Sequence, residues 1–91
     1  MLDSKNSKMC VEVVNKFGHG IQMIKAVEEM AELTQAICKA FGSKSKVDME
    51  NAREELADVA VVLAELQFIF GMTDKELNDR AEIKLEKALQ K

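Results

Sequence analysis

The sequence predicts an all-α protein, and three observations support that prediction. The chain of 91 residues has no Pro and only four Gly, so few positions force a break in a helix. It is rich in Ala, Leu, Glu, Lys and Met, which are strong helix formers. Its apolar residues recur at spacings of three and four, as on one face of a helix. A chain this short forms one domain, here residues 1–91, and it gains core by associating with a second copy.

Glycine and polar residues divide the chain into four predicted helices. The first is expected from about Ser7 to Phe17, where Gly18-His19-Gly20 breaks it, and residues 1–6 are expected to be frayed. The second is expected from Ile21 to about Phe41, with Gly42 closing it.

The third and fourth helices are predicted from their capping residues. Asp48 is the expected N-cap of the third helix, which continues to Phe70 and ends at Gly71. Thr73 followed by Glu76 matches a capping box, so a fourth helix is expected to start there and to fill the remaining chain.

The second helix carries two stripes with helical spacing. One is apolar and is expected to face the core: Met23, Val27, Met30, Ile37 and Phe41. The other is polar, and a solvated helix face would give the same pattern: Gln22, Lys25, Glu29 and Glu32.

The third helix is apolar nearly all round, which is typical of a helix that is covered on most sides. Three further helices of this length leave part of it bare, so a second subunit is expected to pack there. Asp58 lies inside this apolar run, where an ionised carboxylate is costly unless it is paired or binds a metal. The structural alternative is a salt bridge from Asp58 to Lys25 or Arg53.

Two carboxylate pairs lie on consecutive predicted helices. Glu29 and Glu32 form the first pair, and Glu55 and Asp58 form the second, each with the i, i+3 spacing that places both members on one helix face. In an antiparallel hairpin the four groups converge, and their repulsion favours a cation between them. Oxygen ligands without His or Cys suit Mg²⁺, with Mn²⁺ as a substitute. Glu65 lies two turns beyond Asp58, as a further ligand or as a partner in a hydrogen bond or salt bridge.

The net charge and the hydropathy of the chain indicate which classes of binding partner to exclude. A net charge of −3 argues against binding a nucleic-acid polymer, because such proteins usually show a basic stripe. No secretory signal and no membrane-spanning run is recognised, and Cys10 and Cys38 have no metal-ligand spacing. These features predict a soluble, cytoplasmic protein with reduced thiols and no membrane partner.

The acidic motifs resemble those of a known family. The residues Gln22, Lys25, Glu28-Glu29-x-x-Glu32 and Glu55-x-x-Asp58 are similar to the signature of the MazG-like all-α nucleoside triphosphate pyrophosphohydrolases. The resemblance covers roughly Phe17 to Lys87. It implies a four-helix bundle completed by dimerisation, as a homodimer or a homotetramer, and hydrolysis of a nucleoside triphosphate between its α and β phosphates. The products would be the monophosphate and pyrophosphate.

The resemblance also implies roles for single residues. It makes Glu29, Glu32, Glu55 and Asp58 the magnesium ligands and gives Glu28 an assisting role, as a second-metal ligand or as the base that orients water. It places Lys25 at the phosphates and assigns substrate binding to Gln22, Lys25, Lys84 and Lys87.

Two other functions remain open. Phosphoribosyl-ATP pyrophosphohydrolases have similar length and acidic motifs, but they usually continue ExxD into Tyr-His, whereas Val59 and Ala60 follow Asp58 here. The chain is alternatively a catalytically inactive helical dimer that acts as a binding or regulatory module. An Mg²⁺ titration separates the last possibility from an enzyme, because only a metal site gives saturable stabilisation.

Overall fold

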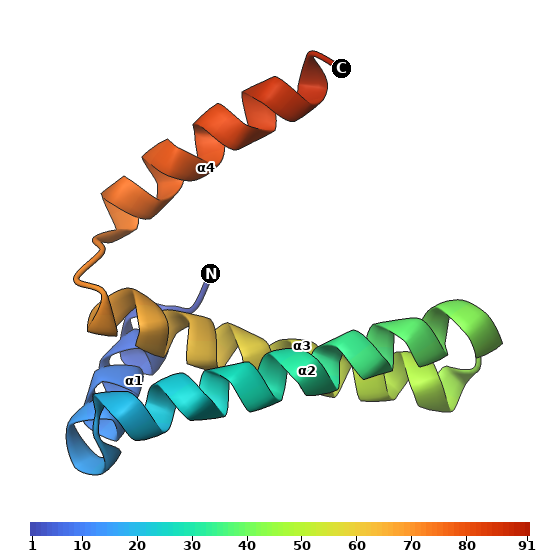
Figure 1. The fold of residues 1–91 in the computed structure, drawn as a ribbon, viewed down its shortest axis with the longest axis horizontal. Coiled ribbons are helices and arrows are strands. Elements are labelled where there is room, and N and C mark those ends of the chain that lie inside the picture. The colour runs from blue at the N-terminus through green and yellow to red at the C-terminus, as the bar shows by residue number, and fades with distance from the viewer.

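The computed structural model describes all 91 residues and contains four helices and no strand, which confirms the all-α prediction. Their bounds are α1 Ser4–Phe17, α2 His19–Ser43, α3 Lys46–Ile69 and α4 Asp74–Leu89. Figure 1 shows α2 and α3 as a long antiparallel hairpin, with α1 against one end of it. The last helix, α4, projects away and packs against none of the other three.

The helix α1 begins earlier than the sequence suggested. The Asp3 side chain caps it by accepting a hydrogen bond from the Asn6 amide at 2.8 Å, so residues 4–6, expected to be frayed, are helical. At its other end only Gly18 interrupts the helices, with φ of +101°. That glycine alone turns the chain, and His19 and Gly20 therefore belong to α2 rather than to a three-residue break.

The turn between α2 and α3 also differs from the prediction. Gly42 is helical, and Lys44 takes the left-handed conformation that closes α2, with φ of +55° and its amide bonded to the Ala40 carbonyl. Ser45, rather than Asp48, is the N-cap of α3, because its hydroxyl accepts the Asp48 amide at 3.1 Å. The Asp48 carboxylate instead accepts a hydrogen bond from the Ser43 hydroxyl.

The junction between α3 and α4 follows the predicted capping. Gly71 has φ of +68° after α3, and Thr73 caps α4 by accepting the Glu76 amide at 3.1 Å. Gln67 donates to the Asp74 carboxylate at 2.6 Å across this junction. The axes of α3 and α4 are bent by 112° relative to each other. No single helix of the chain is long and apolar enough to span a membrane.

The core lies where α1, α2 and α3 meet, and α2 faces α3 with small residues. The buried residues are Cys10, Val14, Gln22, Ala26, Ala36, Ala40, Val59, Val62 and Glu65. The three alanines let the two long helices approach closely. The prediction that the stripe from Met23 to Phe41 forms this core is wrong within one chain, because Val27 is 62% exposed and Phe41 is 81% exposed.

The physical reason is the rotation of α2 about its axis. The row of α2 that faces α3 contains Gln22, Ala26 and Ala36. Each residue of the apolar stripe from Met23 to Phe41 follows a position of that row by one residue, and so points about 100° away from it around the helix axis. Spacing shows that residues share a face, but it does not show which of two faces the neighbouring helix covers.

Candidate acidic metal site

Three of the predicted ligands meet between α2 and α3. Glu29 and Glu32 come from α2 and Glu55 comes from α3, and one carboxylate oxygen of each lies within 4.8 Å of the others. The antiparallel hairpin places the two motifs side by side, and the i, i+3 spacing puts Glu29 and Glu32 on one face of α2. We call these three residues the acidic triad.

Two oxygens of the triad are buried without a partner. Glu29 Oε2 and Glu55 Oε2 are shielded from solvent and accept no hydrogen bond. A carboxylate oxygen in that position loses its hydration and gains nothing in exchange, which is unfavourable in an isolated chain. A cation between the three side chains would offset their negative charge, and a donor set of carboxylate oxygens alone fits a hard divalent metal ion.

Burial and charge repulsion act together on Glu55. Its pKa is raised above the ordinary 4.5, first by burial and then by the negative charges of Glu32, Asp58 and Glu29. Lys25 forms the one ion pair of the triad, with its Nζ atom 3.4 Å from Glu29 Oε1. One half-exposed lysine leaves most of the negative charge of the triad uncompensated.

Asp58, the fourth predicted ligand, lies beside the triad but outside it. Its charge contributes to the raised pKa of Glu55, yet the Asp58 carboxylate is exposed and is not among the three that converge. The expectation of a buried Asp58 is therefore wrong within one chain, because nothing covers that part of α3. The alternative salt bridge is absent too, since Lys25 pairs with Glu29 and Arg53 pairs with Glu50 at 3.7 Å.

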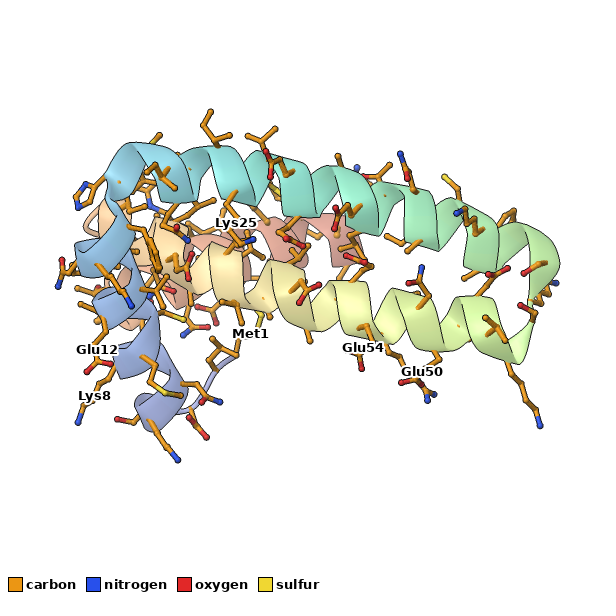
Figure 2. All side chains as sticks on the ribbon, turned by 90° about the horizontal axis from the view of Figure 1, so that it is seen from below. Met1, Lys8, Glu12, Lys25, Glu50 and Glu54 are labelled. Carbon is orange, nitrogen blue, oxygen red and sulfur yellow. The ribbon has the colours of Figure 1, made fainter.

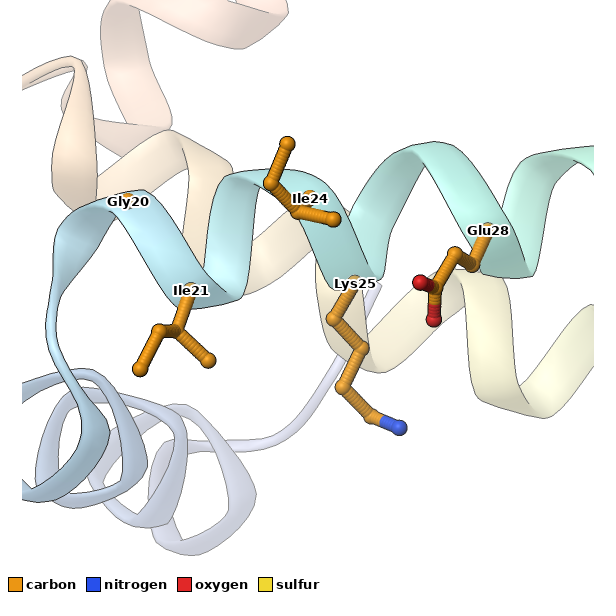
Figure 3. Close-up of a pocket in the computed structure, with 5 residues that line it drawn as sticks. All are labelled: Gly20, Ile21, Ile24, Lys25 and Glu28. Atoms are coloured by element: carbon orange, nitrogen blue, oxygen red, sulfur yellow. The ribbon is translucent and has the colours of Figure 1, made fainter.

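Lys25 and Glu28 line an open pocket of about 380 Å³ on the surface of α2. Figure 3 shows the two side chains projecting from successive turns of α2, next to Ile21 and Ile24. Figure 2 shows Lys25 on the side of the hairpin that α1 crosses. The acidic triad itself does not line this pocket, and Lys25, which pairs with Glu29, is the residue that connects the two.

Gln22 lies in the core rather than on an open surface. Its side chain is 4% exposed, and Nε2 donates to Glu65 Oε1 at 2.7 Å. Of the two roles considered for Glu65, ligand or hydrogen-bond partner, the structure shows the second. The sequence placed Glu65 two helical turns after Asp58 on α3, but it could not show that Gln22 of α2 donates the hydrogen bond to Glu65.

The predicted phosphate-binding lysines of α4 are not brought to the triad by their own chain. Lys84 and Lys87 lie on the projecting helix, which is joined to α3 only near its first residue, by the hydrogen bond from Gln67 to Asp74. Neither lysine forms an ion pair. In comparisons with known proteins, the chain matches no family model, no curated protein and no solved structure.

Proposed function

We propose that the protein is a Mg²⁺-dependent nucleoside triphosphate pyrophosphohydrolase, of the type that the MazG-like motifs resemble. The observation that carries the proposal is the pair of buried, unpartnered oxygens on Glu29 and Glu55, inside a triad built from both acidic motifs. A cluster of exposed acids is common on helical surfaces, but buried carboxylate oxygens without a hydrogen-bond partner are unfavourable, and a bound cation would remove that cost.

The ligand set favours magnesium, with manganese as a substitute. All candidate ligands are carboxylates, and the one histidine of the chain lies at the start of α2, stacked edge-on against Phe68 at 6.3 Å. When bound, the cation would polarise the phosphoryl group under attack and neutralise charge on the departing pyrophosphate.

The residues of the cavity have complementary tasks in this proposal. Lys25 is half exposed and close to the triad, so it can exchange its contact with Glu29 for a phosphate oxygen and stabilise charge that grows during reaction. Glu28 is exposed on the same wall and can orient a water molecule and accept its proton. The predicted role of Gln22 in binding would act through α2, because its amide holds the first turns of that helix against α3.

The proposed enzyme is formed by at least two copies of the chain. The surface area of the chain is 7125 Å² at a mass of 10.2 kDa, whereas a compact monomer of that mass exposes about 5,300 Å². The excess of about 1,800 Å² is larger than the roughly 800 Å² that each partner buries in an interface of ordinary size. The radius of gyration of 15.1 Å likewise exceeds the roughly 12 Å expected for a compact domain.

Product analysis tests the proposal. Purified protein is incubated with a panel of ribo- and deoxyribonucleoside triphosphates, with Mg²⁺ or with chelator, and the products are separated. Monophosphate and pyrophosphate that disappear with chelator are the expected result. Glu55→Gln is expected to abolish turnover, whereas the matched Glu50→Gln, which loses only a surface contact to Arg53, is expected to retain it.

Other outcomes point to specific alternatives. Turnover of phosphoribosyl-ATP but of no triphosphate would replace the proposed substrate. A folded protein that turns over no nucleotide and is not stabilised by Mg²⁺ would contradict the proposal and favour the inactive binding module.

A further inference from the structure

A second pocket lies between α1 and α3, and we call it the α1 pocket. It has a volume of about 270 Å³. Its walls are four apolar side chains, Leu2, Met9, Val13 and Val61. Its polar groups come from Asn6, Cys10 and Glu65. Apolar walls with a few polar groups are typical of sites that bind small molecules.

The Glu65 carboxylate offers one unused hydrogen-bond acceptor to this pocket. Its Oε1 atom accepts the Gln22 amide at 2.7 Å, whereas its Oε2 atom accepts no hydrogen bond. Glu65 is 2% exposed, yet Oε2 is not among the fully shielded unpartnered oxygens, which belong to Glu29 and Glu55. Since Glu65 lines the α1 pocket, a ligand there that donates a hydrogen bond would satisfy Oε2.

No other donor in the α1 pocket uses this acceptor. The Cys10 thiol donates to the Val61 carbonyl, with Sγ 3.8 Å from the oxygen. Burial and the negative charge of Glu65 raise the pKa of Cys10, so the thiol stays protonated and neutral. No Lys, Arg or His lines the pocket, and Glu65 forms no ion pair. The free oxygen is therefore left for a ligand.

The α1 pocket lies on the same side of the hairpin as the acidic site. Glu65 follows Asp58 by seven residues, or two turns, so both lie on one side of α3. Figure 2 shows Lys25, the ion-pair partner of Glu29, on the side that α1 crosses. Glu65 follows Glu55 of the triad by ten residues, about 15 Å along α3. That separation is comparable to the length of an extended nucleoside triphosphate.

We propose that the α1 pocket holds the base of the nucleotide and that Glu65 selects bases with an exocyclic amino group, such as cytosine and adenine. The proposal rests on the proposed function, because a triphosphate at the acidic triad is what brings the base to this pocket. An amino group donates to Glu65 Oε2, whereas the carbonyl oxygen of uracil or hypoxanthine only accepts. The ring N–H of those two bases stands next to that carbonyl, which would face the same carboxylate. The mismatched base therefore leaves acceptors unpaired in a buried site.

The walls of the pocket suit a flat ring. Met9 and Val61 are 44% and 41% exposed, and a ring in the pocket would cover part of both side chains. The Met9 thioether can contact the edge of the ring. No aromatic side chain lines the pocket, so these contacts hold the ring without favouring one base. The choice between bases is left to Glu65.

Matched pairs of substrates test this selection. Cytidine and uridine triphosphates differ by an amino group against a carbonyl, as do adenosine and inosine triphosphates. In each pair kcat/KM is expected to be at least about tenfold higher for the amino-bearing member, because its hydrogen bond is made to a charged group. Equal values in both pairs, measured on an active enzyme, would overturn the selection and leave the proposed function intact.

Glu65→Gln keeps the shape of the side chain and reverses its preference. Because Gln22 donates, the new amide turns its oxygen toward Gln22 and its NH₂ group toward the pocket. The cytidine-to-uridine ratio of kcat/KM should fall by about tenfold or more. Glu54→Gln, at an exposed carboxylate of α3 outside the pocket, is the matched control and should keep the wild-type ratio. A ratio unchanged in Glu65→Gln would overturn the role of Glu65.

Binding is also measured without turnover. Protein labelled with ¹³C at the methionine methyl groups is titrated with cytidine or uridine monophosphate in the presence of Mg²⁺. The Met9 signal, assigned with Met9→Leu, should shift with saturation, and at lower concentrations of cytidine monophosphate. Met49, in the first turn of α3 and outside the pocket, should not shift. A Met9 signal that neither nucleotide moves would overturn the placement of the base.

The two measurements separate the possible failures. A wild type that hydrolyses no triphosphate contradicts the proposed function, and the Met9 titration then decides the α1 pocket by itself. A saturable shift that favours cytidine monophosphate would support the pocket as a site for amino-bearing bases. Equal shifts with both nucleotides would overturn the selection by Glu65.

Discussion

Gln22 and Glu65 form a buried hydrogen bond that joins α2 to α3, with the Gln22 Nε2 atom 2.7 Å from Glu65 Oε1. Both side chains are almost completely shielded from solvent, at 4% and 2% exposure. The bond lies at the end of the hairpin that α1 also covers, near Cys10. The sequence motif assigned Gln22 to substrate binding, and the structure gives it this additional task in holding the helices.

Gln22→Ala should destabilise the protein measurably. It leaves the Glu65 carboxylate buried without its donor, which costs about 2 kcal/mol for a hydrogen bond to a charged group. The free energy of unfolding, measured with urea at pH 7, is expected to fall by that amount. Gln35→Ala, at an exposed position of α2, is the matched control and should change it little. An unchanged unfolding midpoint for Gln22→Ala would show that the bond does not form in solution.

Mg²⁺ should stabilise the folded protein with saturation. A cation that binds the triad only when it is assembled raises the melting temperature until the site is full. Differential scanning fluorimetry with an Mg²⁺ series measures this shift, and Ca²⁺ and K⁺ series test its selectivity. In Glu29→Gln the saturable shift should disappear. A shift of equal size in that variant would mean that magnesium binds elsewhere.

Without metal, stability should fall as pH rises through the region above 4.5. The raised pKa of Glu55 means that the folded state holds a proton that the unfolded state has already released. The protonated Glu55 therefore contributes to folding stability at pH values below its unfolded-state pKa. This contribution is lost as pH rises through the pKa of Glu55 in the folded state. Thermal melts with chelator from pH 5 to pH 8 should show a steeper decline for the wild type than for Glu55→Gln. Parallel curves would refute the repulsion within the triad.

A charge on the exposed apolar stripe of α3, formed by Met49, Leu56 and Leu63, should separate the subunits. Leu56→Glu puts a carboxylate in the middle of the α3 stripe, where 58% of the residue is exposed in one chain and where a second copy would bury it. Light scattering after gel filtration is expected to report a dimer or larger species for the wild type and mainly monomer for the variant. Val47→Glu, exposed but outside the stripe, should leave the mass unchanged. A monomeric wild type would contradict the second copy that is part of the proposed function.

The two cysteines should differ in reactivity. Cys10 is buried, and its pKa is raised by that burial and by the nearby charge of Glu65, so little thiolate is present at neutral pH. Cys38 is exposed on α2. Reaction of the native protein with a coloured disulfide reagent at pH 8 should consume one thiol rapidly and the second only after unfolding. Two rapid equivalents would show that α1 opens easily.

The sequence by itself determined the fold class and the existence of the four helices. It also predicted that four carboxylates converge, and in the structure three of them do. Helix-forming composition and the absence of Pro decide the local conformation, and the i, i+3 spacing decides which carboxylates share a face. The N-cap at Thr73 could be predicted from the sequence because it depends on residues at most four positions apart. The ends at Gly18, Lys44 and Ser45 were less readable, because several neighbouring residues could have supplied the same cap.

Only the tertiary structure decided which side of each helix is covered. The rotation of α2 puts Gln22 and Ala26 against α3 and leaves Met23 exposed, although a periodic pattern is equally compatible with both faces. The exposure of Asp58, the donor to Glu65 and the isolation of α4 follow from contacts between residues far apart in the sequence. The spacing of residues along a helix shows only how their side chains are arranged around that helix axis. Which of these side chains contact another helix is decided by how the helices pack together.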